Sequence, residues 1–217
     1  MKIFGYFRSS AAFRLRIAMN FKGLSYDYNL VNLQSGDHLT DDFKRINPQG
    51  RVPAIDIEGN ILTQSLAIIE YLDEVHPAPP LLPSDPLGKA KVRAIAGLIA
   101  CDIHPLNNLA VLNYLRDQLT AEEEARLAWY RHWVKEGFDG LELMLSANGE
   151  TGQFCFGDTP TVADICLVPQ VVNAKRFNCN LACYPTIIRI FKECMDLSQF
   201  ADADPMNQPE AAELASL

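Results

Sequence analysis

The sequence has no cysteine before Cys101. Its six cysteines lie between Cys101 and Cys194, and none of them has the CxxC or zinc-type spacing of a redox or metal site. Several stand in apolar runs, as Cys166 does, which predicts buried free thiols and a reducing, cytoplasmic environment. Phosphate loops and glycine-rich nucleotide motifs are also absent. The sequence therefore gives no indication of a bound metal or a nucleotide cofactor.

Positive charge is scarce as well, with 19 lysine and arginine residues against 27 acidic ones and a net charge of −8. This balance argues against binding to nucleic acid or to anionic lipid, so any anionic ligand must be held by a local positive cluster. Long apolar runs are missing, because the longest, Ala94–Cys101, is too short to span a bilayer. The N-terminal residues lack the apolar core of a signal peptide, so neither export nor membrane insertion is indicated.

The 217 residues are enough for two modest domains, and five prolines between His76 and Pro86 interrupt every helix or strand pattern. This linker separates a predicted first domain, 1–80, from a predicted second domain, 87–217. In the first domain, strand-like and helix-like segments alternate in the order β-α-β-α-β-β-α of a thioredoxin-like fold. We expect strands at Lys2–Phe7, Tyr26–Val31, Ala54–Ile57 and Asn60–Thr63, a helix from Phe13 closed by Gly23, and a helix at Ser65–Val75.

The second domain is predicted to be all-helical, because its apolar residues recur at helical spacing with few β-branched clusters. Thr161 and Asp164 have the spacing of a capping box, which indicates a structural role at a helix start. The polar, proline-containing segment 201–217 is expected to be mobile. The predicted helices are Lys89–Arg116, Ala121–Ser146, Thr161–Arg176 and Tyr184–Asp196.

Ser9 and Ser10 stand where the first strand passes into the first helix. Unpaired N–H groups and a partial positive charge gather at a helix N-terminus, so a hydroxyl there is suited to hold an anion. Ser65 can cap the following helix or, with the freed N–H groups, hold a carboxylate. Val52-Pro53 is either a cis peptide bond that presents Val52 to an extended peptide or an ordinary trans proline at a strand edge.

Five segments together resemble the zeta class of glutathione transferases, which includes maleylacetoacetate and maleylpyruvate isomerases. The paired serines followed by Arg-x-Arg are the most discriminating part, and the resemblance extends to about Leu197. The segments are 8–18 (RSSAAFRLRIA), 47–53 (NPQGRVP), 64–72 (QSLAIIEYL), 102–108 (DIHPLNN) and 164–177.

The resemblance implies that glutathione is the cofactor and that Ser9, with Ser10 close behind, stabilises its thiolate. It further implies that Arg8, next to Ser9 in the sequence, is catalytic together with the two serines. The implied residues that bind a diacid substrate are Arg8, His104 and Arg176. Without the resemblance, the sequence favours an ordinary surface arginine at Arg176, and the alternative for His38 and Gln49 is that they are solvated loop residues. The implied glutathione-binding set is Ser9, Ser10, His38, Gln49, Val52, Gln64, Ser65, Asp102, His104, Asn107 and Asn108.

Two departures from the family pattern stand out. Members typically have Ser-Ser-Cys and then, after one residue, tryptophan, whereas this chain has Ala11 and Phe13. Some maleylpyruvate isomerases carry basic residues where this chain has Leu109 and Ala110. Isomerisation is compatible with the loss of the cysteine, because glutathione supplies the thiol.

The leading hypothesis is therefore a cytoplasmic, glutathione-dependent cis–trans isomerase of small unsaturated diketo diacids in the breakdown of aromatic compounds. A homodimer is implied by the resemblance, and no nucleic-acid or membrane partner is expected. Two alternatives remain open. One is a glutathione transferase that conjugates or dehalogenates electrophiles. The other is a non-enzymatic binding protein with the transferase fold.

Overall fold

The computed structural model describes residues 1–147 and 149–211. Contacts within the chain divide it into two units. The first consists of Met1–Pro80 together with the chain from Asp196 onward, and the second is Leu81–Met195.

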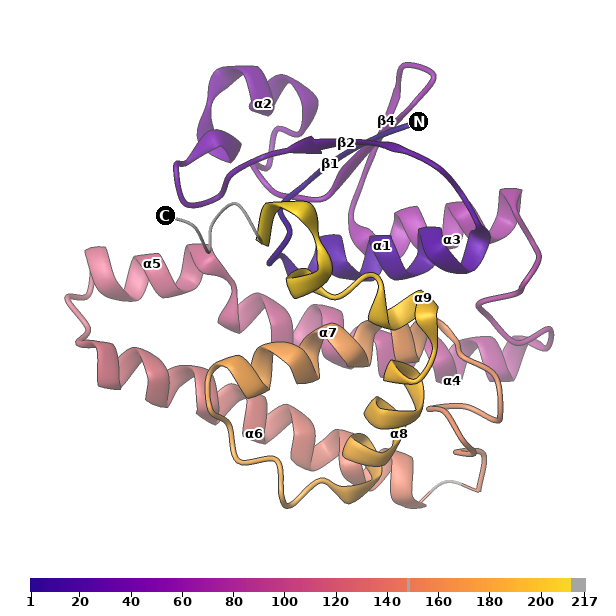
Figure 1. The fold of residues 1–217 in the computed structure, drawn as a ribbon. Coiled ribbons are helices and arrows are strands. Elements are labelled where there is room, and N and C mark those ends of the chain that lie inside the picture. The colour runs from indigo at the N-terminus through magenta and orange to yellow at the C-terminus, as the bar shows by residue number, and fades with distance from the viewer. Residues whose placement is uncertain (148, 212–217) are drawn as a thin grey trace. The chain divides into compact units, whose positions relative to one another are not determined.

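A four-stranded mixed sheet forms the centre of the first unit, in the order β2-β1-β3-β4 (Figure 1). β1 (Lys2–Gly5) pairs in parallel with β2 (Asp27–Leu30) and antiparallel with β3 (Ala54–Ile57), which pairs antiparallel with β4 (Asn60–Thr63). The predicted thioredoxin-like fold is thus confirmed. The first two strands are shorter than predicted, and the last two have the predicted bounds.

Helices cover both faces of this sheet (Figure 1). α1 (Ser10–Lys22) and α3 (Ser65–Val75) lie on one face, and α2 (Asp41–Ile46) lies on the other. Because side chains alternate along a strand, Phe4 points away from the main core and meets Phe43 of α2 edge to face at 6.5 Å. The buried core against α1 and α3 consists of Ile3, Leu15, Met19, Ile55, Ile68 and Leu72.

Glycine sets the end of α1, as the sequence predicts. Gly23 adopts a left-handed conformation with φ 61°, and its N–H donates to the Asn20 carbonyl at 3.2 Å. The β3–β4 hairpin also needs left-handed backbone, at Glu58 (φ 52°) and Gly59 (φ 88°), which is the two-residue turn that suits the twist of paired strands.

The single helix predicted over Lys89–Arg116 is wrong, because the chain changes its helical type three times in this stretch. Pro105 has no N–H to donate to the preceding turn, so one helical hydrogen bond is lost there. The chain accommodates this loss with a π-helical turn followed by a 3₁₀ turn. Asn108 then caps a new helix by accepting from the Val111 N–H at 3.0 Å. The successive elements are α4 (Pro86–Gly97), η2 (Leu98–Ile103), η3 (His104–Asn107) and α5 (Leu109–Asp117).

The other helices of the second unit lie within a few residues of their predicted bounds: α6 (Glu123–Ala147), α7 (Val162–Arg176) and α8 (Pro185–Met195). The predicted capping box at the start of α7 is confirmed. Asp164, fully buried, accepts from the Thr161 N–H and the Cys155 N–H, both at 2.8 Å. Burial raises the pKa of this carboxyl group, and its hydrogen bonds oppose that shift.

One helical stretch, Pro86–Asp117, is long and apolar enough to cross a membrane by length and composition. It consists of the elements from α4 to α5, and within the second unit α4 packs against α7. Its buried apolar side chains, including Val92 and Ile95, belong to the core of that unit. Only 28% of the apolar window is buried, so the core of the unit accounts for part of its apolar content.

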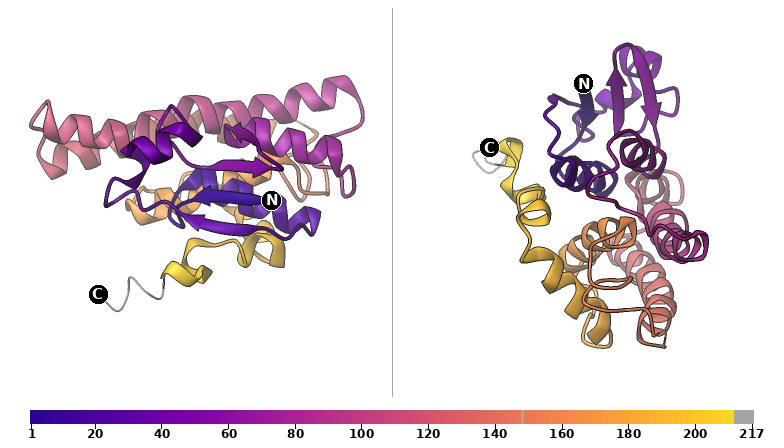
Figure 2. Two further views of the ribbon diagram at one scale, coloured as in Figure 1. Left: turned by 90° about the horizontal axis from the view of Figure 1, so that it is seen from above. Right: turned by 90° about the vertical axis from the view of Figure 1, so that its right-hand side faces the viewer.

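Residues 198–211 pack within the first unit, in contrast to the mobile tail that composition predicts over 201–217; positions 212–217 of that prediction lie outside the described residues. The Asn20 side chain donates to the Gln199 carbonyl at 3.0 Å, and Phe21 and Phe200 meet edge to face at 5.3 Å. Figure 2 shows this yellow segment running beside α1. It contains α9 (Ser198–Ala201), and by its contacts it joins the thioredoxin-like unit, whereas the sequence places it in a domain of 87–217.

Candidate functional site

Ser9 is the N-cap of α1. Its hydroxyl oxygen accepts from the Ala12 N–H at 3.3 Å, and its carbonyl accepts from the Phe13 N–H at 2.8 Å. A hydroxyl that accepts one bond still has its own hydrogen to donate. Ser9 is partly exposed, whereas Ser10 is buried, with 6% of its surface accessible. The geometry therefore favours Ser9 over Ser10 as the donor to an anion at this helix end.

Arg8 belongs to a tight turn between β1 and α1, which the Ser9 N–H closes by donating to the Tyr6 carbonyl at 2.9 Å. Its guanidinium group lies over the Phe7 ring, 4.9 Å from the ring centre. The same turn thus presents a cation and a hydroxyl in adjacent residues. This pairing is suited to an anionic sulfur or to a carboxylate next to it.

Val52 lies near this turn within the first unit. The Val52–Pro53 peptide bond is cis, one of the two forms that the sequence suggests. The Val52 side chain is partly buried against a cluster that includes Tyr6 and Phe7. The residue before the cis proline and the turn that carries Ser9 are therefore brought together.

Gln64 and Gln49 are in direct contact. The Gln64 side-chain amide donates to the Gln49 side-chain oxygen at 2.9 Å, and both residues are exposed. Gln64 has a left-handed φ of 70° and directly precedes α3, whose first residue is Ser65. An exposed pair of amides beside a helix start offers N–H donors to a carboxylate.

His38 lies in the short 3₁₀ helix η1 (Asp37–Leu39). Its backbone carbonyl lies so close to Gly50 that a Cβ there would approach it to 2.8 Å, which places His38 next to the loop of Gln49. Burial lowers the pKa of the His38 imidazole, and the positive charge of Arg51 acts in the same direction. The ring is therefore mainly neutral at neutral pH.

In the second unit, the predicted residues from Asp102 to Asn108 follow the change of helix type. The Asn107 side chain is buried and donates to the Tyr130 carbonyl at 3.4 Å, and the Asn108 side chain caps α5. Both amides thus have structural contacts inside the unit. Asp102 is exposed and His104 is partly buried at the start of η3.

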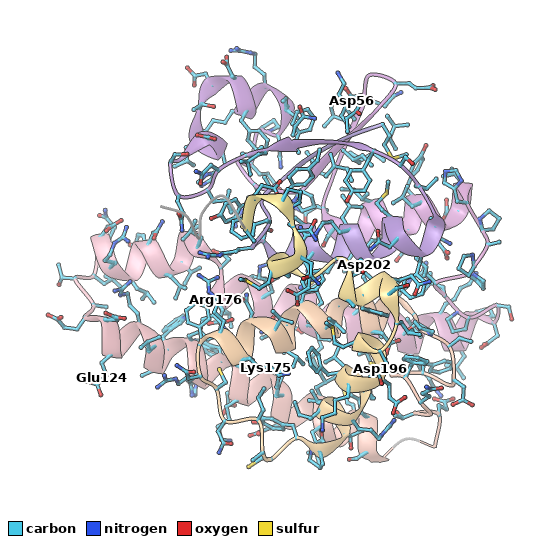
Figure 3. All side chains as sticks on the ribbon, in the orientation of Figure 1. Asp56, Glu124, Lys175, Arg176, Asp196 and Asp202 are labelled. Carbon is cyan, nitrogen blue, oxygen red and sulfur yellow. The ribbon has the colours of Figure 1, made fainter. Side chains whose placement is uncertain are left out.

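Arg176 is exposed and belongs to the last turn of α7. Figure 3 labels it at the end of that helix. Its guanidinium group lies over the ring of Phe177, 5.4 Å from the centre, and Phe177 stacks on Tyr130 at 3.9 Å. The positive charge of Arg176 lowers the pKa of the Tyr130 hydroxyl, although burial outweighs it and raises that pKa. The arginine is therefore held over an aromatic stack with its charge accessible to solvent. Within the described residues, no group of three or more His, Cys, Asp or Glu side chains is placed to hold a metal ion.

Comparison with known proteins gives the family of this chain. Residues 8–75 match the family model described as "Glutathione S-transferase, N-terminal domain". A maleylpyruvate isomerase from Ralstonia is 47% identical over 212 residues, which are 98% of this chain and 100% of that protein. A solved holo structure of a bacterial maleylpyruvate isomerase, described as a zeta-class glutathione transferase, has a TM-score of 0.95 at 47% identity and covers 97% of this chain and 99% of its own. The chain belongs to the zeta class of glutathione transferases.

A second solved member of the class is a maleylacetoacetate isomerase from Anaeromyxobacter dehalogenans, with dicarboxyethyl glutathione and citrate bound in its active site. It has a TM-score of 0.84 at 36% identity and covers 97% of this chain and 93% of its own. The ligands of that structure are a glutathione adduct of a diacid and a free polycarboxylate.

Two arginines of α1 in this transferase were not predicted from the sequence as functional residues. Arg14 is 2% exposed, and its guanidinium group donates to the Ser65 hydroxyl at 3.4 Å, so it connects the starts of two helices at the predicted site. Arg16 is also 2% exposed and donates to the Phe7 carbonyl at 3.0 Å. The sequence feature that could have indicated a role for them is that both charged residues stand among apolar residues of the same helix.

Proposed function

We propose that this transferase is a glutathione-dependent cis–trans isomerase of unsaturated diketo diacids of the maleylacetoacetate or maleylpyruvate type. The observation that carries the proposal is Ser9 at the N-cap of α1, because a donor hydroxyl stands there and no protein thiol does. Ala11 replaces the cysteine that the family usually has two residues later. The nucleophile must therefore come from bound glutathione.

The residues of the first unit suit a tripeptide with one thiol and two carboxylates. Ser9 faces the sulfur, and Val52, before its cis proline, lies beside the turn that carries Ser9. The amides of Gln49 and Gln64, with Ser65 at the start of α3, suit one carboxylate, and His38 suits the other. Each of these groups is a hydrogen-bond donor or a backbone edge, which is the chemistry that a peptide ligand needs.

Bound glutathione supplies a thiolate that adds reversibly to the substrate double bond, so that the bond between those two carbons can rotate. Ser9 donates its O–H to the sulfur and stabilises the thiolate, together with the positive end of the α1 dipole. A free thiol has a pKa of about 8.5, so this stabilisation increases the reactive fraction at neutral pH. The role of Ser10 is secondary because it is buried.

Arg8 and Arg176 are proposed to bind the carboxylates of the substrate. In a chain with a net charge of −8, a diacid needs local positive charge to bind. Planar guanidinium groups suit carboxylates better than ammonium groups do. We propose the same contact for His104. The diacid adduct and the citrate in the Anaeromyxobacter relative support this substrate class. A homodimer and a cytoplasmic location are proposed from the family and from the free cysteines.

The decisive experiment is to mix the protein with maleylacetoacetate or maleylpyruvate and to follow the loss of substrate absorbance with and without glutathione. Turnover should require glutathione and should leave its concentration unchanged. Full activity in buffer without glutathione would contradict the proposal.

A second candidate, conjugation, uses the same thiolate. The glutathione adduct bound to the Anaeromyxobacter relative is the observation that favours it, because a stable thioether is a conjugation product. The two functions differ in whether the sulfur leaves again. Mass spectrometry of the product decides between them, since an isomerase releases a product without glutathione and a conjugating enzyme consumes one glutathione for each substrate.

A further inference from the structure

Arg16 holds two parts of the first unit together. Its Nη2 donates to the Phe7 carbonyl at 3.0 Å and to the Ala203 carbonyl at 2.9 Å, and its Nε donates to the same Ala203 oxygen at 3.0 Å. Phe7 precedes Arg8 and Ser9, and Ala203 belongs to residues 198–211, which we call the C-terminal segment. One buried guanidinium group therefore connects that segment to the turn that carries Ser9.

The acceptors on Arg16 are backbone carbonyls. The carboxylates that act on its charge, those of Asp204 and Glu210, are on the C-terminal segment, and the hydroxyl groups of Tyr26 and Tyr28 face it from the sheet side. Burial lowers the pKa of the guanidinium group, and these groups oppose that shift. The environment of the cation is thus built jointly by the C-terminal segment and by Phe7, Tyr26 and Tyr28 of the rest of the first unit.

The C-terminal segment is anchored independently on both sides of Ala203. Phe200 is fully buried and meets Phe21 of α1, and further along Ala211 packs on a cluster that includes Tyr6 and Phe7. Ala203 itself is 1% exposed. The Ala203 carbonyl is therefore held in place, and Arg16, by donating to it and to the Phe7 carbonyl, can fix the position of Phe7 relative to the segment.

We propose that Arg16 is a positioning residue for the thiolate site, and that it acts by tying the turn of Phe7, Arg8 and Ser9 to the C-terminal segment through the Ala203 carbonyl. The inference rests on the proposed function, because it concerns the hydroxyl that stabilises the glutathione sulfur. Two carbonyls that accept from one planar group define its position more closely than either would alone. An error of about 1 Å in placing a reacting group can lower a rate by as much as 100-fold.

The first test is Arg16→Lys, which keeps a cation but replaces the planar fork with one ammonium group. The bound thiol should titrate about one pKa unit higher, measured by the ultraviolet absorbance of the thiolate, and kcat should fall about tenfold with the KM for glutathione within about twofold. Asn20→Ala is the matched control, because it removes a bond from α1 to the same segment, at Gln199, without touching Phe7. It should leave the thiol pKa unchanged.

The second test uses the unaltered protein, in case Arg16→Lys does not fold. If the segment positions the site, a ligand at the site must stabilise the segment by the same coupling free energy. Glutathione should therefore slow hydrogen exchange of the Phe200 and Asp204 amides, which donate to Leu197 and Ala201 carbonyls, by about threefold or more. The Gly59 amide, which donates to Asp56 in the hairpin at the opposite end of β1, is the reference and should not change.

The outcomes separate this inference from the proposed function. If the unaltered protein neither binds glutathione nor lowers its thiol pKa, the proposed function is wrong and the inference fails with it. If the unaltered protein does both, an unchanged thiol pKa in folded Arg16→Lys overturns the inference alone. The inference is also overturned if glutathione leaves the hydrogen exchange of the Phe200 and Asp204 amides unchanged.

Discussion

Replacing Ser9 separates its two roles, as the cap of α1 and as the donor to the sulfur. A hydrogen bond to a charged group is worth about 1.5–3 kcal/mol. Its loss in Ser9→Ala should therefore lower kcat by about 10-fold to 150-fold and raise the pKa of bound glutathione by about one to two units. The affinity for glutathione should change much less, because the bond is strongest to the thiolate.

The same substitution removes the cap, since the Ser9 oxygen accepts from the Ala12 N–H. An alanine cap costs about 1 kcal/mol of stability and a glycine cap only a few tenths. Ser9→Ala and Ser9→Gly should therefore differ in urea unfolding but share the same kinetic loss. Stopped-flow turnover and ultraviolet titration of the thiolate measure the kinetic part, with Ser10→Ala as control. If Ser9→Gly keeps the kcat and the thiol pKa of the unaltered protein, then Ser9 is only a cap.

Three further predictions concern other parts of the chain. Arg176→Ala should lower kcat/KM for the diacid about tenfold or more and leave glutathione affinity unchanged. The control Lys175→Ala, one residue away in the same helix, should have little effect. If Arg176→Ala loses as much kcat/KM with an uncharged substrate analogue as with the diacid, Arg176 is structural. Asp164→Ala should lower the free energy of unfolding by about 3 kcal/mol in urea denaturation, because two buried N–H groups lose their acceptor. His38 holds fewer protons in the folded state than in the unfolded chain, so its contribution to stability is lost as pH falls below its ordinary pKa of 6.5. The stability of His38→Gln, followed by thermal unfolding between pH 7 and 5, should depend less on pH, and an unchanged slope would contradict the assignment.

The fold was largely predictable from local signals. Gly23 ends α1 where its spacing indicates, and the turn at Glu58 and Gly59 sets the register of the β3–β4 hairpin. The break of the helix around Pro105 was not predicted in full. Proline indicates that a hydrogen bond is lost, but whether the chain bends, forms a π turn or starts a new helix depends on packing that the sequence does not display.

The packing of the C-terminal segment was missed for a similar reason. Its composition is polar, and its burial depends on a few contacts to residues nearly 180 positions earlier, such as Asn20 with Gln199. Composition indicates only how exposed a segment is on average, whereas this segment is held in place by a few individual long-range contacts. The roles of Ser9 and Val52 were suggested by motif, and the structure adds which serine is exposed and which proline isomer is present.

All six cysteines of this transferase lie between positions 101 and 194, so the thioredoxin-like unit that bears Ser9 contains no sulfur nucleophile of its own. Glutathione disulfide that reaches Ser9 meets a hydroxyl, which does not exchange with a disulfide bond. Oxidised glutathione should therefore act at this site only as a reversible competitor, removed by dilution. As oxidised glutathione accumulates, the enzyme would lose activity at this site, and it would recover when the ratio of the two forms is restored, because the unit that bears Ser9 has no modified cysteine to reduce.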